Sequence, residues 1–299
     1  MNILVTGAWQ YTDEQLESLK QMGHTVSVLS DERDEIPCPY DDIEGVICNG
    51  LFLYHDIEKF KNLRYIQTTS AGLDRIPMEY VKENNIELHN ARGVYSIPMA
   101  EFAVCGVLQL YKKSKFFMDN QSLHKWEKHR NLLELSGKTV CILGCGSVGT
   151  ECAKRFRAFA CQVIGIDIVV RTDENFTEIL PLSEMDKALL ISDIVVLTLP
   201  LTDETRGMFD ERKFSVMKKG ALFVNIARGQ IVDQAAMIDA LKNRLFGAVL
   251  DVFDEEPLSE NSPLWDMENV IVTPHNSFHG EGNGDRLFEG IYQNSEKLL

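Results

Sequence analysis

The chain has 299 residues, enough for about two domains that each bury a core of their own. Its composition, 44% hydrophobic and 25% charged, is that of a globular protein, and a formal charge of −15 excludes a broad basic surface for nucleic acid or anionic membranes. No run reaches the roughly 18 apolar residues of a membrane span, and the start, MNILVTGAWQ, has no basic segment of a secretory signal, so we expect a cytoplasmic protein.

Seven cysteines are spread along the chain, and no CxxC pair occurs among them. Most lie inside apolar runs, a pattern that indicates buried reduced thiols and argues against a zinc site or a disulfide framework. We therefore expect no bound metal. The positions are Cys38, Cys48, Cys105, Cys141, Cys145, Cys152 and Cys161.

Residues 1–90 alternate apolar runs with helical patterns. The runs are NILVT, TVSVLS, GVICN, YIQTTS and IELHN, and helices are expected over 13–22, near 56–61 and near 78–84. This alternation predicts a parallel sheet flanked by helices, which binds ligands at the carboxyl ends of its strands. At one such end Ser70, Ala71 and Gly72 offer backbone N–H groups to an anion, although a segment of this kind is more often only a turn.

A long helical pattern follows over residues 96–117, with Pro98 and Glu101 near its start, as helix starts prefer. Its many apolar residues predict a mostly buried helix that connects two domains. The polar segment 119–134 is interpreted as a surface loop bridging these domains, and its histidines as structural.

From residue 137 the alternation resumes with about six strands: TVCILG, QVIGID, DIVVLTLP, ALFVNIA, AVLDVF and VIVTP. Helices separate them, one of them over 234–243. This is the number of strands in a full dinucleotide-binding sheet. A final helix, 286–299, is expected to return to the first domain.

The first of these strands leads into Gly144, Gly146 and Gly149, a GxGxxG spacing. The first glycine allows a tight turn, the second lets the backbone approach a pyrophosphate at a helix N-terminus, and the third lets the helix pack on the strand. Asp167 ends the next strand, where a carboxylate accepts from both ribose hydroxyls of NAD and repels a 2′-phosphate. GxGxxG alone also fits a turn in any α/β protein, but the whole strand, turn, helix, strand and acid series indicates dinucleotide binding.

Seven motifs then occur in a fixed order: SAGLD (70–74), MAEFAV (99–104), ELSGKTVCILGCGSVG (134–149), LPLTDETRGM (199–208), VNIARGQIVD (224–233), LDVFDEEPL (250–258) and VIVTPH (270–275). Together they resemble the D-isomer-specific 2-hydroxyacid dehydrogenases over nearly the whole chain. The resemblance implies an α/β protein with two doubly wound parallel sheets. A flavodoxin-like substrate domain is expected over 1–94, completed by 280–299, and a Rossmann NAD-binding domain over 95–279.

The resemblance places the family's substrate arginine at Arg228, its dyad acid at Glu256 and its general acid/base at His275. Reduction of a 2-oxo acid requires a hydride donor, a proton donor and a cation that grips the carboxylate, and these residue types supply the last two. Each has a simpler interpretation alone: Arg228 as a surface arginine, Glu256 as a solvated acid, His275 as a capping or core histidine. Together they favour an NAD-dependent oxidoreductase that interconverts a 2-oxo acid and a D-2-hydroxy acid.

The resemblance also implies ligand contacts outside this triad. The substrate carboxylate is expected on the backbone of Ser70, Ala71 and Gly72, assisted by Arg228. Small 2-oxo or 2-hydroxy acids and a second copy of the chain, as a C2 homodimer, are the only partners expected. The cofactor contacts beside the glycines are expected at Ser147, Val148, Asp167, Thr198, Pro200, Thr205, Ile226 and Asp251, the last facing the nicotinamide amide.

The chain departs from the family pattern at three places. Ser147 is often an arginine, and Asn276-Ser277-Phe278-His279 replaces an apolar residue and glycines after the histidine. Cys48-Asn49-Gly50 stands where the phosphoglycerate branch has an arginine, which disfavours a phosphate-bearing substrate, although Arg75 or Arg92 could substitute. The substrate side chain is therefore left open.

Two other functions are considered. A non-catalytic NAD(H)-sensing or corepressor-like protein on the same fold is compatible with the motifs, although the intact triad argues against a loss of chemistry. A formate dehydrogenase relative is disfavoured because that branch lacks the dyad glutamate, which is present here as Glu256.

Overall fold

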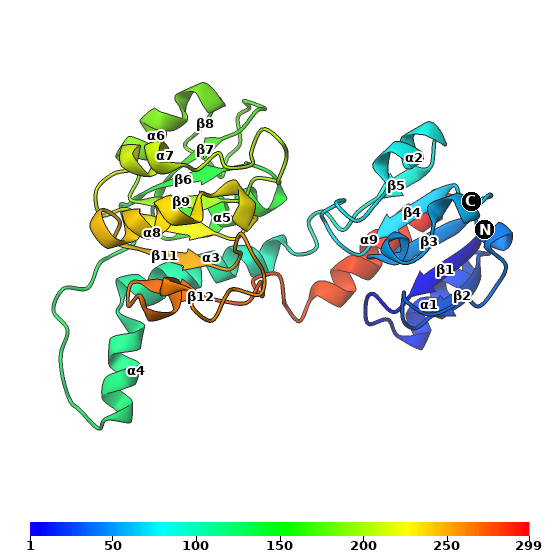
Figure 1. Ribbon diagram of the computed structural model, residues 1–299, viewed down its shortest axis with the longest axis horizontal. Coiled ribbons are helices and arrows are strands. Elements are labelled where there is room, and N and C mark those ends of the chain that lie inside the picture. The colour runs from blue at the N-terminus through cyan, green and yellow to red at the C-terminus, as the bar shows by residue number, and fades with distance from the viewer. Residues whose placement is uncertain (299) are drawn as a thin grey trace. The chain divides into compact units, whose positions relative to one another are not determined.

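The computed structural model describes residues 1–298, and the chain divides into two compact units. The small unit comprises Met1–Tyr95 and Gly280–Leu299, and the large unit comprises Ser96–His279. Each unit is built around one sheet whose strands all run parallel, as Figure 1 shows. In both, ligand-binding groups are expected at the carboxyl edge of the sheet.

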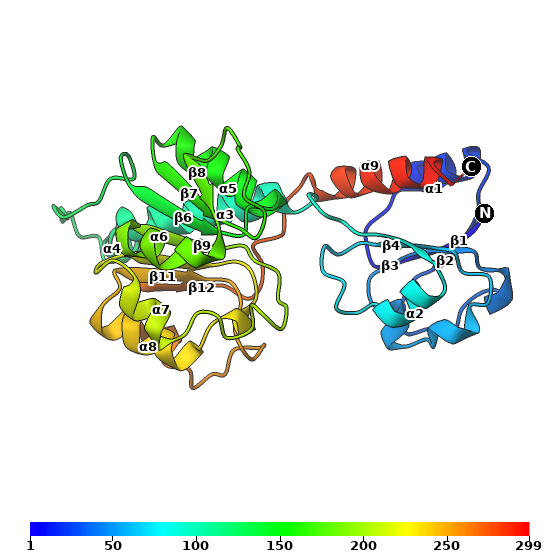
Figure 2. The same cartoon turned by 90° about the horizontal axis from the view of Figure 1, so that it is seen from above.

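The small unit has five strands in the order β2-β1-β3-β4-β5, a flavodoxin-like arrangement. Alternate side chains of each strand enter opposite cores, as the period of two demands. Leu4, Val46 and Ile66 pack on the side of α2, and Ile3, Val5 and Ile47 pack on the side of α1 and α9 (Figure 2). The elements are β1 (Asn2–Thr6), α1 (Asp13–Gln21), β2 (Thr25–Leu29), β3 (Gly45–Cys48), β4 (Tyr65–Thr68), α2 (Met78–Glu83), β5 (Glu87–His89) and α9 (Asn283–Glu296).

The large unit has seven strands in the order β12-β11-β10-β9-β6-β7-β8, the Rossmann order with one added strand. Helices α6, α7 and α8 cover one face, and α3 and α5 cover the other. The chain reverses its winding between β6 and β9, so this point marks the expected cofactor crevice. The strands are β6 (Thr139–Leu143), β7 (Gln162–Ile166), β8 (Glu178–Leu180), β9 (Ile194–Leu197), β10 (Leu222–Asn225), β11 (Gly247–Leu250) and β12 (Val270–Val272). The helices are α3 (Ser96–Tyr111), α4 (Ser114–Ser122), α5 (Ser147–Ala158), α6 (Met185–Ile191), α7 (Glu211–Val216) and α8 (Gln234–Asn243).

Several expected elements differ from the structure. The single helix over 96–117 is wrong, because the chain breaks at Lys113, whose φ of 52° lies in the left-handed region, and continues as α4. The segment 119–134 belongs wholly to the large unit and does not bridge two domains. Strand β8 was missed because its three residues are too short to form a pattern, and the helix near 56–61 is only a 3₁₀ turn, Ile57–Lys59.

The buried thiols behave as inert core groups. Burial raises the pKa of Cys145 and Cys152 to about 12, so both stay protonated near neutral pH. Cys105, on α3, is exposed, contrary to the general expectation of burial. Within residues 1–298 no helix is long and apolar enough to cross a membrane, and no three His, Cys, Asp or Glu side chains gather as a metal site.

Candidate active site

The glycine turn between β6 and α5 has the shape that a dinucleotide phosphate requires. Gly144 has a φ of +94°, and a Cβ on Gly149 would lie 2.0 Å from the carbonyl oxygen of Gly144. Only glycine fits at these two positions. A Cβ on Gly146 would meet no atom within 4 Å, so open space lies over the N-terminus of α5. An anion placed there would face the N–H groups of the first helical turn.

Asp167 is fixed beside this turn. Its Oδ2 accepts from the N–H of Cys145 at 2.6 Å, and its Oδ1 accepts from the N–H of Val169 at 2.9 Å. Each oxygen keeps one acceptor position, enough for two ribose hydroxyls. Arg171 lies close by, because its Nη2 donates to the carbonyl of Cys145 at 2.5 Å.

Three further expected cofactor residues line the same edge of the sheet. The hydroxyl of Thr198 donates to the carbonyl of Gly144 at 2.6 Å, which ties the end of β9 to the glycine turn. The hydroxyl of Thr205 donates to the carbonyl of Pro200 at 2.7 Å and shapes the loop that follows. Ile226 is only 1% exposed, so any ligand contact from this residue comes from its backbone.

His275 and Glu256 are brought together in the large unit. The Nδ1 atom of His275 lies 2.9 Å from Oε2 of Glu256, while Oε1 of Glu256 accepts from the N–H of Phe253 at 3.0 Å. A carboxylate only accepts, so Nδ1 carries a proton in this pair and Nε2 is the atom left for a ligand. The side chain of His275 is 39% exposed.

The position of His275 depends on the buried carboxylate of Asp251, which is 0% exposed. This carboxylate accepts from the hydroxyl of Thr273 at 2.6 Å and from the N–H groups of Asn276 and Ser277 at 2.8 and 2.9 Å. Between these donors His275 has a φ of +49°, a conformation rare for non-glycine residues and often found at functional sites. Asp251 therefore holds the turn that presents His275, and its expected contact with the nicotinamide amide stays a prediction.

Arg228 follows β10 at the same edge. The buried amide of Asn225 shapes its loop by accepting from the N–H of Ala227 at 3.0 Å and donating to the carbonyl of Arg228 at 3.2 Å. The guanidinium of Arg228 donates to the carbonyl of Ala227 at 2.7 Å. No hydrogen bond or ion pair in the described part of the chain joins it to Glu256 or His275, and its other N–H groups remain for a ligand.

In the small unit, the segment Ser70–Gly72 follows β4 and has its carbonyl groups occupied. The carbonyls of Ser70, Ala71 and Gly72 accept from Thr68, Asn90 and Ser70 side chains at 2.8, 2.7 and 2.9 Å. Among residues 1–298 no hydrogen bond uses the N–H groups of Ala71 and Gly72. The segment thus presents donors and few acceptors, as a carboxylate cradle requires.

The unusual residues after His275 form an aromatic contact. The Phe278 ring meets the His275 ring edge-on at 5.9 Å, and His279 packs on Phe278 at 4.2 Å. His279 is exposed and makes no contact with Glu256 among the described residues. This arrangement agrees with its interpretation as a wall or surface residue.

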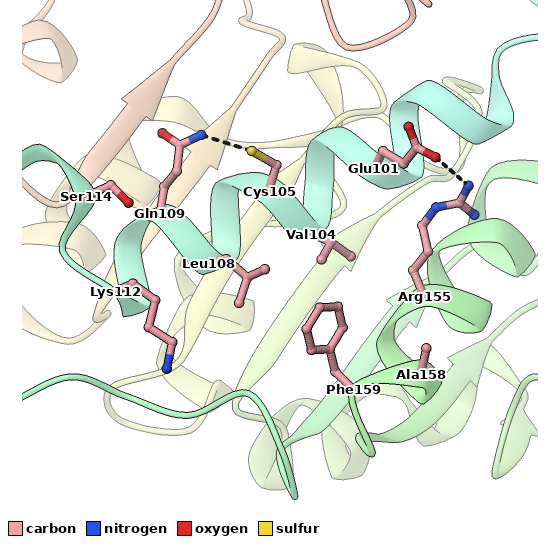
Figure 3. A pocket seen from close by; sticks show the side chains of 10 residues that line it. All are labelled: Glu101, Val104, Cys105, Leu108, Gln109, Lys112, Ser114, Arg155, Ala158 and Phe159. Atoms are coloured by element: carbon pink, nitrogen blue, oxygen red, sulfur yellow. Dashed lines mark hydrogen bonds and ion pairs between the residues drawn. The ribbon is translucent and has the colours of Figure 1, made fainter. Parts of the chain in front are cut away.

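A hollow of about 490 Å³ on the large unit is not part of this site. It lies over α3 and the end of α5, where Val104, Leu108 and Phe159 form its floor (Figure 3). Arg155 and Glu101 pair across one end at 3.0 Å. None of the expected catalytic, cofactor or substrate residues lines it.

Two supporting residues were missed from the sequence. Thr273, which bonds to Asp251, stands in the VIVTPH motif but carries no signal of its own. Asn225 ends a strand directly before the arginine loop, and its position at a strand end was the available clue.

Comparison with known proteins identifies the family. Residues 104–277 match the model of the family "D-isomer specific 2-hydroxyacid dehydrogenase, NAD binding domain". The chain is 35% identical over 280 residues to D-3-phosphoglycerate dehydrogenase of Archaeoglobus fulgidus, covering 92% of this chain and 53% of that protein.

Two solved structures share the fold over nearly the whole chain. D-lactate dehydrogenase from Aquifex aeolicus, complexed with NAD and lactic acid, has a TM-score of 0.78 and 25% identity, covering 99% of this chain and 95% of its own. A D-isomer specific 2-hydroxyacid dehydrogenase from Xanthobacter autotrophicus Py2, in complex with NADPH and MES, has a TM-score of 0.80 and 26% identity, again covering 99% and 95%.

The chain belongs to the D-isomer specific 2-hydroxyacid dehydrogenase family, and its large unit is the NAD-binding domain. It spans about half the length of the D-3-phosphoglycerate dehydrogenases that it matches.

Proposed function

We propose that the protein is an NAD-dependent oxidoreductase that interconverts a 2-oxo acid and the corresponding D-2-hydroxy acid. The observation that carries the proposal is the 2.9 Å pair of His275 and Glu256, held in a strained turn by a buried carboxylate. Because Nδ1 is bound to Glu256, Nε2 is the ring nitrogen left for a substrate.

The residues at the β6–β9 crevice fit NAD. The space over Gly146 receives a pyrophosphate, and the free acceptor positions of Asp167 receive the two ribose hydroxyls. Asp167 disfavours a 2′-phosphate, whereas Arg171 beside it would attract one. We propose that NADH is preferred because the carboxylate is anchored at the strand end itself.

The protein's own residues account for binding and for the proton. Bound NADH supplies the hydride that C2 of the oxo acid receives, and NAD⁺ remains. Arg228 holds the substrate carboxylate and polarises the ketone. His275 donates the proton on Nε2 to the carbonyl oxygen, and Glu256 stabilises the imidazolium before the transfer. In the reverse direction neutral His275 takes that proton back.

We further propose that the protein acts as a homodimer, as the family resemblance implies. Helix α4 and the segment after it contain Met118, Leu123 and Trp126, whose exposed fractions are 66%, 61% and 97%. Exposed large apolar side chains are common at association sites. Light scattering after size exclusion should give twice the chain mass, and a strictly monomeric protein would contradict the proposal.

The direct test of the function is NADH oxidation with a panel of 2-oxo acids that includes glyoxylate, pyruvate and hydroxypyruvate. Turnover of at least one acid is expected, and the reverse reaction should use the D but not the L enantiomer. His275→Gln is the matched control, because it keeps the size and loses the acid/base group. Equal rates in both proteins would contradict the role given to His275, and NADH binding without turnover of any acid would instead favour a sensing protein.

A further inference from the structure

The carboxyl edge of the small sheet contains a second group of anion-binding donors, beside the Ser70–Gly72 segment. The register pairs Cys48 of β3 with Thr68 of β4, and the N–H of Thr69 donates to the carbonyl of Cys48 at 2.8 Å. Asn49 and Gly50 therefore begin one strand away from Ser70. Neighbouring strands lie about 4.8 Å apart, a span that a short 2-oxo acid covers from its carboxylate to its far end.

The donors at this second position are already occupied by the chain itself. Oε1 of Glu32 accepts from the hydroxyl of Thr6 at 2.8 Å and from the N–H of Asn49 at 2.7 Å. Oε2 of Glu32 accepts from the N–H of Gly50 at 2.7 Å. Two successive N–H groups and a hydroxyl would otherwise form a nest for a phosphate or carboxylate.

The backbone of Glu32 is held in place by a hydrogen bond from a neighbouring histidine. The carbonyl of Glu32 lies 2.9 Å from Nε2 of His55, and Nδ1 of His55 lies 3.0 Å from the hydroxyl of Tyr40. A carbonyl only accepts, so Nε2 of His55 donates and Nδ1 accepts from Tyr40. The side chain of Glu32 is half-buried, and its Oε2 keeps one acceptor position.

Resting on the proposed function, we propose that Glu32 is a specificity-determining residue. It rejects 2-oxo acids whose far end is anionic. It accepts 2-oxo acids whose far end carries a hydrogen-bond donor, such as a hydroxyl. A phosphate would meet a fixed negative charge and filled donors. Exposed Arg75, whose Cδ would lie 3.8 Å from a Cβ on Gly50, offsets only part of that repulsion. A hydroxyl would instead donate to the free position on Oε2.

The test compares hydroxypyruvate, its 3-phosphate ester and pyruvate as substrates of wild type, Glu32→Ala and Glu32→Gln. Wild type should favour hydroxypyruvate over the ester by about tenfold or more in kcat/KM, which corresponds to ~1.4 kcal/mol. Glu32→Ala should narrow that ratio by about tenfold, mainly through a lower KM for the ester. Pyruvate, which has no far group, is the reference substrate to which the other two rates are compared in each protein.

Glu35→Ala is the matched control, because it removes the same charge from the same exposed segment without emptying the nest. Its substrate ratio should equal that of wild type. A wild-type preference for the phosphate ester, or an unchanged ratio in both Glu32 variants, would overturn the assignment.

A binding experiment separates this inference from the proposed function. In amide NMR spectra, 3-phosphoglycerate should leave the N–H signals of Asn49 and Gly50 unmoved in wild type and shift them in Glu32→Ala. This result would support the nest even if no oxo acid were turned over. A shift of these two signals in wild type would contradict the assignment, whatever the enzyme assays show.

Discussion

Each of the two units contains a carboxylate that accepts the same set of hydrogen bonds, and the two carboxylates differ in burial. Asp251 in the large unit and Glu32 in the small unit each accept from one threonine hydroxyl and two successive backbone N–H groups. Asp251 is wholly buried, and its carboxylate holds the turn that carries His275. Glu32 is half-buried, and its Oε2 keeps one acceptor position. We propose that this difference in burial lets the same hydrogen-bond pattern fix the histidine in one unit and contact a ligand in the other.

In the proposed function, the large unit governs turnover and the small unit governs the choice of substrate. Substitutions in the large unit should lower kcat for every substrate, whereas those at Glu32 should change the ratio between substrates. The variants below test that division.

Arg228→Lys should have the largest effect among the variants that keep His275 and Glu256. Lysine keeps the charge and loses the planar fork, so kcat/KM for any 2-oxo acid should fall by about 100-fold. NADH affinity, measured by fluorescence titration, should stay within about twofold of wild type, because the side chain belongs to no expected cofactor contact. Loss of NADH binding with an unchanged KM for the oxo acid would show the assignment to be wrong.

Asp251→Asn tests the buried carboxylate of the large unit. The amide NH₂ would face the N–H of Asn276 or Ser277, so the variant should lose about 2–4 kcal/mol of unfolding free energy and about tenfold or more in kcat. Chemical denaturation and steady-state kinetics measure the two effects. Glu32→Gln is the matched comparison, and an equal loss of kcat on pyruvate there would remove the proposed difference between the units.

Asp167→Ser should change the cofactor preference. Without the carboxylate the 2′-phosphate meets less repulsion, and Arg171 stays in place to attract it. The ratio of kcat/KM for NADH over NADPH should therefore fall by about tenfold, and the oxo-acid KM should change little. An unmodified protein that prefers NADPH would contradict the role given to Asp167.

Asp193→Asn should have the smallest effect and concerns stability alone. Burial raises the pKa of this carboxyl, but the hydrogen bonds from Lys218 and from the N–H of Thr139 outweigh burial, and the net pKa is lowered. A lowered folded-state pKa stabilises the protein above the ordinary value of about 3.9, and the stabilisation is lost as the pH falls through the folded value.

The Asp193→Asn variant should therefore lose about 1 kcal/mol at pH 7, and its deficit should shrink as the pH falls below about 4. Thermal unfolding at both values measures this. The exposed Asp203 offers the control variant Asp203→Asn, which should match wild type. A loss of stability that grows as the pH falls would contradict the lowered pKa of Asp193.

The sequence predicted most strands and the class of fold because buried parallel strands are continuous apolar runs. It failed where a local event decides the structure, as at Lys113, whose left-handed backbone splits the expected long helix. The site was predicted through its motifs, yet the role of Asp251 in holding the turn was not, because three hydrogen bonds to one buried carboxylate leave no periodic signal. Glu32 was missed for a related reason, since it stands in the acidic run Asp31–Glu35, which by pattern alone is a solvated segment.

We propose that His275, charged beside Glu256, donates the proton in reduction. This role of His275 is tested most directly by kcat/KM for reduction from about pH 5 to 9 in wild type, Glu256→Gln and His275→Gln. Glu256→Gln removes the charge that stabilises the imidazolium, so the pH at which reduction declines should move downward. His275→Gln should be slower by roughly 10²- to 10⁴-fold in both directions. An unshifted profile in Glu256→Gln together with near-full activity in His275→Gln would contradict the account.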